Sequence, residues 1–344
     1  MPELIVTNFN PNFTGVSATA AGVVRWQARH YDMALAGHPL PGCPAPITRM
    51  QALRASRRPA PGRPFTIWHV RRNPEMRAAI LARDILRLPI RAVFTSAAIR
   101  RHSAFPRWLI ARMDAVIATT EAAAAFVPHV RAVVPHGVDT DRFTPAATRA
   151  AAWAATGIPG THGIATIGRI RPEKGTDRFV EAMLGLLPER PGLTALVIGR
   201  AANSDAGFLA GLKARIAAAG LSGRILFPGE VAPEALPGLV RALSLVVQLP
   251  RYEGYGMAPL EGMASGVPFV ATDQGYYRVF SGGESCGLIA PPGEAAPAIA
   301  AILNDPDRHA AMARAARARA VDDFSLAREA EGIAAVYDDL WTGR

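Results

Sequence analysis

Short runs of apolar and β-branched residues alternate along the chain with longer segments rich in alanine, leucine and arginine. This alternation predicts parallel sheets with helices on both faces, an α/β fold. The predicted strands are 4–7, 65–70, 92–95, 115–119 and 132–135 in the first half and 163–167, 194–198, 225–227, 245–248 and 268–271 in the second. Predicted helices include 177–186, 208–219, 259–264 and 324–341. The stretch 39–64, rich in proline, arginine and glycine, is predicted to be a loop or a short interrupted helix.

The two groups of strands predict two domains. The stretch from Pro145 to Pro159 follows the segment Pro135-His-Gly-Val-Asp139-Thr-Asp-Arg-Phe143-Thr-Pro145, and we place the linker there. The first domain is then residues 1–147, completed by a C-terminal helix within 324–344, and the second is residues 148–323. Two nucleotide-binding folds facing each other would leave a cleft, with ligands at the carboxyl ends of the strands.

The amino-acid composition indicates a folded protein without a disulfide framework or a zinc site built from cysteines. The chain has 344 residues, of which 50% are hydrophobic and 19% charged, so it can bury a sizeable core and is not disordered. Cys43 and Cys286, the two cysteines, cannot form a disulfide framework or a zinc-ligand set. The N-terminus has no basic region followed by an apolar run, and no apolar stretch approaches ~18 residues. We therefore expect a cytoplasmic protein without a membrane-spanning helix.

The net charge of +10 is unevenly distributed. Residues 1–150 hold 20 arginines, no lysine and eight acidic residues, whereas residues 151–344 hold 18 basic and 20 acidic residues. The whole excess of positive charge thus lies in the first half. Such a surface could serve an anionic membrane, a nucleic acid or an acidic substrate.

The first candidate site is the segment Thr166-Ile-Gly168-Arg169-Ile-Arg171-Pro-Glu-Lys174-Gly175. A predicted strand ends at a glycine, a short basic loop follows, and a helix begins near Thr176. Such a loop would let Arg169 and Lys174 converge on one anionic group at the strand's carboxyl end. A solvated basic turn would have a similar sequence, but the chain has 36 arginines and two lysines, and one of those lysines lies here.

The second candidate site is the segment Glu253-Gly-Tyr-Gly256-Met-Ala-Pro259-Leu-Glu261-Gly-Met-Ala, a turn between a predicted strand and a helix. Proline suits the first turn of a helix, and the glycines let backbone amides there approach a phosphate closely. Glu253 and Glu261 can accept hydrogen bonds from neighbouring hydroxyls, as an acidic residue does with ribose in dinucleotide folds. For either glutamate alone, a tight turn in which Glu261 only favours the helix dipole is the alternative.

These two segments, together with the connector His136-Gly-Val-Asp139…Arg142-Phe143…Pro145, resemble the retaining glycosyltransferases of family four. That family has the GT-B fold, in which two Rossmann-like doubly wound domains face each other across a cleft. The motifs occur in the family's order and spacing, and the resemblance covers most of the chain from about residue 90 onward. The first domain, with Trp68-His-Val-Arg-Arg-Asn-Pro-Glu-Met76 and Val93-Phe-Thr-Ser-Ala-Ala98…Arg100-Arg-His102, is similar to lipopolysaccharide core mannosyltransferases of alphaproteobacteria.

The resemblance implies a role for each matched residue. Arg169 and Lys174 would hold the donor's diphosphate in the loop that Gly168 opens, and Glu261 would bind the ribose. Glu253 would contact hydroxyls of the transferred sugar and would be catalytic together with Arg169 and Lys174. The remaining donor-binding residues would be Gly254, Tyr255, Gly256 and Met257 around the distal phosphate, and Gly15 in the first loop.

The chemistry that the resemblance implies is transfer of a sugar, mannose from GDP-mannose, to a hydroxyl with retention at the anomeric carbon. Charge develops on the leaving diphosphate in an oxocarbenium-like transition state, and Arg169 and Lys174 would stabilise it without a metal or other cofactor. No strong protein nucleophile is evident. The implied route is front-face attack, in which a phosphate oxygen of the donor takes the proton of the acceptor.

The charge distribution then assigns the donor to the second domain and an acidic acceptor to the first. The acceptor would be a glycolipid such as lipid A carrying 3-deoxy-octulosonic acid, used at the inner face of the cytoplasmic membrane by a peripherally associated enzyme. Solvated arginines in an arginine-rich chain are the alternative. The candidate acceptor-binding residues, just past expected strand ends, are His69, Arg71, Arg72, Arg100, Arg101 and His102.

The sequence alone does not exclude several other functions. A family-four enzyme could use another nucleotide sugar or another polysaccharide or glycolipid acceptor. A non-catalytic protein that binds membranes or polyanions would explain the arginines but not the paired glutamates, and without a recognition motif we expect no nucleic-acid partner. An epimerase or a sugar phosphorylase could share the fold, although a phosphorylase needs a cofactor lysine and Lys213 is the only other lysine.

Overall fold

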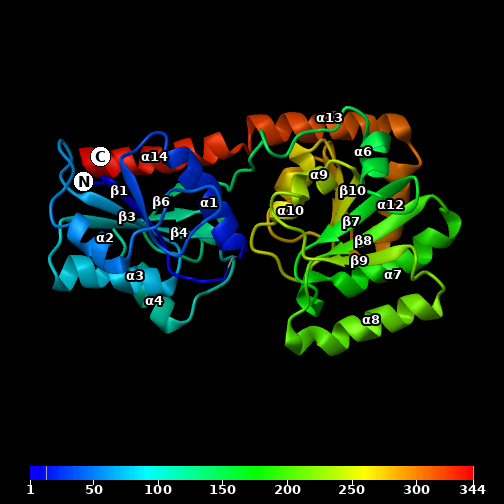
Figure 1. Ribbon diagram of the computed structural model, residues 1–344, viewed down its shortest axis with the longest axis horizontal. Coiled ribbons are helices and arrows are strands. Elements are labelled where there is room, and N and C mark those ends of the chain that lie inside the picture. The colour runs from blue at the N-terminus through cyan, green and yellow to red at the C-terminus, as the bar shows by residue number, and fades with distance from the viewer. Residues whose placement is uncertain (13, 344) are drawn as a thin grey trace. The chain divides into compact units, whose positions relative to one another are not determined.

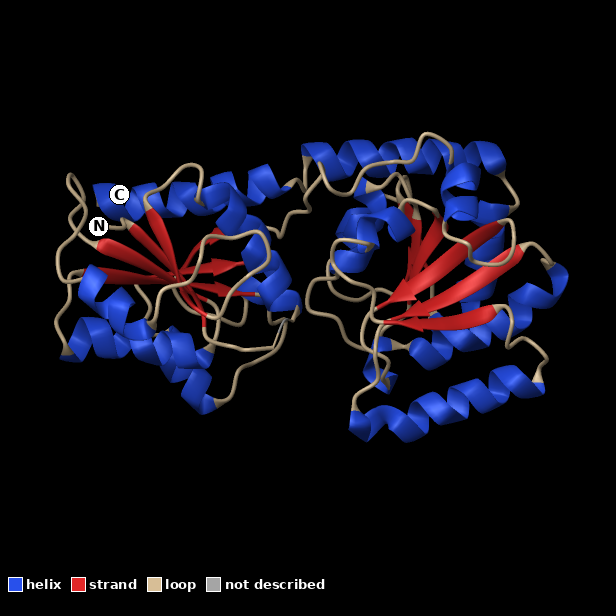
Figure 2. Ribbon diagram, in the orientation of Figure 1, coloured by secondary structure: helices blue, strands red, loops and turns tan. Residues whose placement is uncertain are grey.

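The computed structural model describes residues 1–12 and 14–343 and divides the chain into two compact units. Unit 1 is Met1–Gly137 with Ser325–Arg344, and unit 2 is Val138–Phe324. Unit 1 therefore contains both ends of the chain (Figure 1). Each unit holds a six-stranded parallel sheet with helices on both faces (Figure 2), so the α/β architecture predicted from the alternating pattern is confirmed.

The sheet of unit 1 has the strand order β2-β1-β3-β4-β5-β6. One face packs against α1 and the C-terminal helix α14, and the other face packs against α2, α3 and α4. The strands are β1 (Leu4–Asn8), β2 (Met33–Gly37), β3 (Thr66–Val70), β4 (Ile90–Ser96), β5 (Ala115–Ala118) and β6 (Val130–Val133). The helices are α1 (Gly15–Gln27), α2 (Arg49–Ala55), α3 (Asn73–Ile80), the π-helical turn η1 (Leu81–Ile85), α4 (Ala104–Ile110), α5 (Glu121–Ala124) and α14 (Leu326–Thr342).

The sheet of unit 2 has the strand order β12-β11-β10-β7-β8-β9. Helices α7, α8 and α12 cover one face, and α6, α9, α10, α11 and α13 cover the other. The strands are β7 (His162–Ile167), β8 (Leu193–Ile198), β9 (Ile225–Gly229), β10 (Leu243–Gln248), β11 (Phe269–Ala271) and β12 (Gly287–Ile289). The α-helices are α6 (Arg149–Ala155), α7 (Thr176–Leu186), α8 (Ala206–Ala218), α9 (Leu236–Val240), α10 (Met257–Ala264), α11 (Tyr277–Ser281), α12 (Ala295–Leu303) and α13 (Pro306–Asp322). Short 3₁₀ turns are η2 (Pro172–Lys174), η3 (Leu187–Glu189), η4 (Asn203–Asp205) and η5 (Pro292–Glu294).

The boundary between the units lies earlier than the predicted one at residue 147, because the segment after Gly137 already packs in unit 2. Val138 and Phe143 are buried in the core that α10 and α13 cover. The Arg317 guanidinium donates to the carbonyl oxygens of Thr140 at 3.1 Å and Phe143 at 2.9 Å. The C-terminal helix α14 packs against α1 in unit 1, the unit to which the sequence assigned it.

The sequence does not predict the edge strands β2 and β12. Strand β2 reads Met-Ala-Leu-Ala-Gly and β12 reads Gly-Leu-Ile, so neither has a run of β-branched residues. Alanine and glycine have weak strand propensity. These two strands exist because a neighbouring strand supplies the backbone hydrogen bonds, and that neighbour is distant in sequence.

Candidate active site

The loop after β7 places its cationic residues at the carboxyl edge of the sheet of unit 2. Arg169 is exposed, and the half-buried Lys174 ends the turn η2 just before α7. Between Lys174 and α7 lies Gly175, with φ 69°, and a Cβ at this residue would lie 1.8 Å from the carbonyl oxygen of Leu249. Only glycine fits there, so this close backbone approach fixes where the loop turns into the helix.

The two candidate sites of the sequence meet at Lys174 and Glu253. The Lys174 Nζ donates a hydrogen bond to Glu253 Oε2 at 2.7 Å, and both side chains are only partly exposed. Glu253 Oε1 also accepts from the backbone N–H of Gly254 at 3.0 Å. Because the two residues come from separate loops, after β7 and after β10, the ion pair fixes the loops relative to each other. The sequence predicted both residues but not their pairing.

Tyr277 is a residue of this site that sequence reasoning missed. It is fully buried, and burial together with the charge and hydrogen bond of Glu253 raises the pKa of its hydroxyl well above the usual value. A Cβ at Gly256, which has φ 106°, would lie 2.0 Å from the Tyr277 ring. Gly256 therefore leaves space for the Tyr277 ring. It also adopts the positive φ with which the backbone enters α10.

Several donor-binding candidates in the second site have their groups already engaged. The Tyr255 side chain is buried and packs against the rings of Tyr276 and Phe280, both with centroids 5.4 Å away. The prediction that Tyr255 binds the donor can therefore concern only its backbone. The Gly254 amide is bound to Glu253, and Met257 is half-buried against the core under α10. The backbone amides at the start of α10 remain the candidates for a phosphate.

Glu261 lies on α10, half-buried, and burial raises the pKa of its carboxyl to about 7. The nearby Arg142 opposes this shift. The carboxyl is therefore a group whose charge changes near neutral pH.

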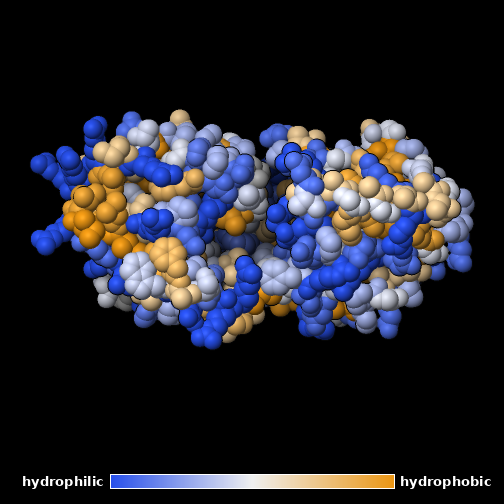
Figure 3. Space-filling model, turned by 90° about the horizontal axis from the view of Figure 1, so that it is seen from below, coloured by the Kyte–Doolittle hydropathy of each residue, from blue (hydrophilic) through white to orange (hydrophobic). Residues whose placement is uncertain are grey.

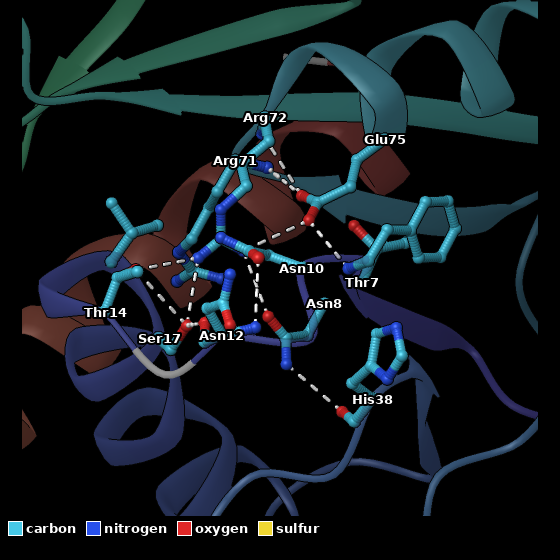
Figure 4. Close-up of polar contacts among 12 residues, drawn as sticks. Thr7, Asn8, Asn10, Asn12, Thr14, Ser17, His38, Arg71, Arg72 and Glu75 are labelled. Atoms are coloured by element: carbon cyan, nitrogen blue, oxygen red, sulfur yellow. Dashed lines mark hydrogen bonds and ion pairs between the residues drawn. The ribbon is translucent and has the colours of Figure 1, made fainter. Parts of the chain in front are cut away.

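In unit 1 the corresponding edge is organised by the buried carboxylate of Glu75 (Figure 4). Its oxygens accept from the backbone N–H groups of Phe9 at 3.0 Å, Arg71 at 2.7 Å and Arg72 at 3.1 Å. The Arg72 side chain also donates to Glu75 at 3.3 Å. Glu75 thus holds the loop after β1 and the loop after β3 together. Sequence reasoning missed this role because three of its four donors are backbone N–H groups and one of them, from Phe9, is 66 residues away.

The Arg72 guanidinium spans from α3 to the loop after β1. It donates to Asn8 Oδ1 at 3.0 Å, Thr14 Oγ1 at 3.1 Å and Ser17 Oγ at 2.9 Å, as Figure 4 shows. These bonds, together with the bond to Glu75, occupy most of its donors. The prediction that Arg72 contacts an acceptor is corrected accordingly, because in this structure Arg72 positions the loop that leads to Gly15.

His69 is fully buried, with both ring nitrogens engaged. Nε2 lies 2.7 Å from Thr95 Oγ1, and Nδ1 forms a short hydrogen bond with the Tyr337 hydroxyl of α14. Burial, and after it the charge of Arg71, lowers the pKa of His69 well below the usual value, so the ring is neutral. The prediction for His69 is therefore corrected: it ties β3 to β4 and α14 and offers no free group to a ligand.

Among the other candidates of unit 1, Arg71 is buried, whereas Arg100, Arg101 and Gly15 are exposed. Arg100 and Arg101 are exposed after β4, and His102 is half-buried, with its pKa lowered by burial and then by Arg100. Gly15 is exposed at the start of α1, and a Cβ there would meet nothing within 4 Å. Neither backbone conformation nor packing within the described residues requires a glycine at this position.

The connector residue His136 pairs with a residue that the sequence did not indicate. His136 Nδ1 lies 2.7 Å from Glu329 Oε1 on α14, and Glu329 Oε2 accepts from the backbone N–H of Gly137 at 2.8 Å. A Cβ at Gly137 would lie 2.3 Å from the Ser325 carbonyl oxygen. His136 therefore has the role in connector geometry that the sequence suggested, and Glu329 is its partner.

The part of the chain that the structure describes holds neither a metal-binding cluster nor a membrane-spanning helix. Within residues 1–12 and 14–343, no three or more His, Cys, Asp or Glu side chains are grouped so that they could hold a metal ion. None of the helices formed by these residues has the length and apolar character needed to span a bilayer.

Comparison with known proteins decides the family. A family model described as glycosyl transferases group 1 matches residues 156–319. The chain is 43% identical to the lipopolysaccharide core biosynthesis mannosyltransferase LpsB of Rhizobium meliloti (strain 1021), over 98% of this chain and 97% of the relative. The chain belongs to the group 1 glycosyltransferases. This glycosyltransferase is also 41% identical to the mannosyltransferase of the same description, LpcC, from Rhizobium leguminosarum bv. viciae, over 98% of this chain and 96% of the relative.

The fold of this group 1 glycosyltransferase is GT-B. The crystal structure of Anabaena HepE in complex with UDP and glucose superposes with a TM-score of 0.82, at 17% identity, over 98% of this chain and 100% of that one. All the charged donor-site candidates, Arg169, Lys174, Glu253 and Glu261, lie inside the segment matched by the family model. The protein is an enzyme, so a non-catalytic polyanion-binding role is excluded as its main function.

Proposed function

We propose that this glycosyltransferase transfers mannose from GDP-mannose, with retention at the anomeric carbon, to an acidic sugar of the lipopolysaccharide inner core. The observation that carries the proposal is the Lys174–Glu253 ion pair, which joins a phosphate-binding cation and a sugar-binding carboxylate from two loops. The descriptions of LpsB and LpcC support mannose as the sugar and the lipopolysaccharide core as the product.

In the proposed reaction unit 2 stabilises the leaving group. The bond between the anomeric carbon and the diphosphate breaks, the acceptor oxygen bonds to that carbon on the same face, and its proton passes to an oxygen of the leaving GDP. Arg169 and Lys174 would neutralise the charge that develops on the diphosphate, so the reaction needs no metal ion. Glu253 orients Lys174 before the donor binds and would accept hydrogen bonds from sugar hydroxyls.

A panel of nucleotide sugars tests the donor. Release of free nucleoside diphosphate is measured for GDP-mannose, UDP-glucose, UDP-galactose and ADP-heptose, with and without lipid A that carries 3-deoxy-octulosonic acid. We expect release from GDP-mannose that depends on the acceptor, and a product with the anomeric configuration of the donor. A preference for a uridine or adenosine donor would replace GDP-mannose, and an inverted product would contradict the mechanism.

The raised pKa of Glu261 predicts a pH-dependent affinity for the donor. The ionised carboxylate accepts hydrogen bonds from ribose hydroxyls better than the neutral acid, and with a pKa of about 7 it ionises between pH 6 and 8. The KM for the donor is therefore expected to fall by up to about tenfold over this range as pH rises. Glu261→Gln, which cannot ionise, serves as the comparison, and an equal pH dependence in this variant would rule out Glu261 as the cause.

We also propose that unit 1 attaches the enzyme to the inner face of the cytoplasmic membrane. Large apolar side chains are exposed in and just after η1 (Leu81, Ile85, Leu86) and on α4 (Phe105, Trp108), and we call them the apolar membrane face. Figure 3 views unit 1 from the side of α3 and α4 and shows apolar side chains gathered there. The segment 77–112, which contains the apolar membrane face, holds eight arginines and one acidic residue. Arg83 and Arg91 pair with Asp114, which leaves most of these arginines for lipid headgroups.

The contacts within the apolar membrane face suit an interface of lipid headgroups. The Phe105 and Trp108 rings stack with centroids 6.2 Å apart, and the Arg112 guanidinium lies 4.0 Å from the centroid of the Trp108 ring. Tryptophan is enriched at membrane–water interfaces, and each arginine near an anionic surface contributes about 1 kcal/mol of binding. The combination fits an anionic bilayer better than a neutral one.

Phe105→Ser combined with Trp108→Ser is expected to weaken binding to vesicles of phosphatidylglycerol and phosphatidylethanolamine by at least about tenfold, because two apolar side chains leave the bilayer. Sedimentation with vesicles measures the effect. The control is Val321→Ser, which removes an exposed apolar side chain from unit 2. Unchanged vesicle binding of the double variant would show that the apolar membrane face does not contact lipid.

A further inference from the structure

Arg71 has a buried guanidinium with no hydrogen-bond partner in the part of the chain that the structure describes. The residue directly follows β3 and is 8% exposed, and its backbone N–H is held by Glu75. None of its three side-chain nitrogens has a hydrogen-bond partner among the described residues. A buried cation without a partner normally costs several kcal/mol. Arg72, its neighbour in sequence, makes four side-chain hydrogen bonds instead.

The carboxylates near Arg71 are engaged elsewhere. Tyr337, Glu329 and Glu75 favour its charged form, but burial outweighs them and lowers the pKa of the guanidinium. Both oxygens of Glu75 are held by the backbone of Arg71 and Phe9, and both oxygens of Glu329 are held by His136 and Gly137. The chain therefore has anions close enough to keep Arg71 charged, but none of them forms a hydrogen bond with its side chain.

Two further polar groups at the same edge of the sheet are also buried without a partner among the described residues. They are the hydroxyls of Ser96, which ends β4, and Thr119, which directly follows β5. Strands β3, β4 and β5 are consecutive neighbours and parallel, so their carboxyl ends lie along one edge. Side chains alternate between the two faces along a strand. Arg71 and Thr119 are in phase with Ile67 and Ile117 of the face that α1 and α14 cover, whereas Ser96 is in phase with Phe94 of the opposite face. The five guanidinium N–H donors of Arg71 and the Thr119 hydroxyl therefore share one face at this edge.

We infer that Arg71, with Thr119 two strands away on the same face of the sheet, binds the carboxylate of the sugar-acid acceptor. The inference rests on the proposed function and deepens it. A guanidinium presents two parallel N–H groups that match the two oxygens of a carboxylate, and one buried positive charge balances one carboxylate. When the acceptor is bound, its carboxylate accepts the hydrogen bonds of the Arg71 guanidinium that no described residue accepts. Arg72 is then a positioning residue, which holds the loop after β1 and touches no substrate.

The test compares two acceptors that differ in one group: lipid A carrying 3-deoxy-octulosonic acid, and the same acceptor with its carboxylate reduced to the alcohol. The wild type, Arg71→Gln and Arg58→Gln are assayed with saturating donor; Arg58 is an exposed arginine of unit 1 and serves as the matched control. We expect reduction of the carboxylate to lower kcat/KM of the wild type by about 10²-fold, the range found when a buried charge pair is truncated.

With the acidic acceptor, the kcat/KM of Arg71→Gln is expected to fall below the wild-type value by about the same factor. With the reduced acceptor, the kcat/KM of Arg71→Gln is expected to show no further loss. Its KM for the donor remains within about twofold of the wild-type value, and Arg58→Gln behaves as the wild type. The inference is overturned if Arg71→Gln still prefers the acidic acceptor, if its donor KM rises as much as its acceptor KM, or if loss of the lipid A phosphates reproduces the effect.

Two measurements without catalysis complete the test. Arg71→Gln without ligand is expected to melt at or above the wild-type temperature, because the substitution removes an unpartnered buried charge; a large fall in Tm would show a structural role instead. Calorimetric titration with the methyl glycoside of 3-deoxy-octulosonic acid is expected to show binding to the wild type and not to Arg71→Gln. If the wild type binds this glycoside but transfers no sugar, the proposed function fails alone, and if it transfers sugar without binding the glycoside through Arg71, the inference fails alone.

Discussion

Lys174→Ala is expected to lower kcat/KM for sugar transfer by about 10²–10³-fold, the usual cost of removing one charged contact to a developing anion. The free energy of unfolding should change little, because the hydrogen bond to Glu253 joins two partly exposed side chains, and such ion pairs contribute about 1 kcal/mol or less. The measurement is acceptor-dependent release of GDP from GDP-mannose, together with Tm.

The chain offers a matched control in its only other lysine. Lys213 lies on α8 with its ammonium 5.5 Å from the centroid of the Phe227 ring, so Lys213→Ala removes the same charge from the same unit. Its activity is expected to match the wild type. Arg169→Ala and Glu253→Ala are expected to lose most transfer while remaining folded. Near-normal activity in Lys174→Ala, Arg169→Ala and Glu253→Ala together would refute the assignment of the site.

Glu75→Gln is expected to lower the free energy of unfolding by roughly 3–5 kcal/mol, the range for breaking a buried charged network. One carboxylate oxygen is replaced by an NH₂ group that faces N–H donors of Phe9, Arg71 or Arg72, so buried donors lose their acceptor. Urea unfolding followed by circular dichroism measures the change. The control is Glu331→Gln, which alters an exposed glutamate of α14 in the same unit. A loss below about 1 kcal/mol would mean that the loops do not depend on Glu75.

The sequence predicted the central strands of both sheets because they are buried on two faces and form continuous apolar runs. Strand β8 (Leu193–Ile198), for example, is wholly buried and consists almost entirely of apolar residues. The edge strands β2 and β12 carry no such signal. The domain boundary was misplaced because nothing in the composition of residues 138–147 shows that Arg317, far along the chain, holds their carbonyl groups.

The donor-site candidates were predictable because each motif is contiguous and lies in one loop. What the sequence could not show is which side chains meet across loops, such as Lys174 with Glu253 and Tyr277 with Glu253. In unit 1, Arg71 and Arg72 are adjacent and chemically identical in the sequence. Only the fold separates them, because one guanidinium reaches the loop after β1 and the other is buried without a hydrogen-bond partner among the described residues.

The placement of α14 in unit 1 has a consequence for biosynthesis. The helix supplies Ile333, Val336, Tyr337 and Trp341 to the first core, yet it is synthesised only after the whole of unit 2. Unit 2, formed by one continuous stretch, can fold as soon as it is synthesised, whereas one sheet face of unit 1 stays uncovered until α14 has followed unit 2. A nascent chain stalled before residue 325 would therefore expose that face to chaperones, and a stop codon there would leave a protein with an intact second unit and an incomplete first one.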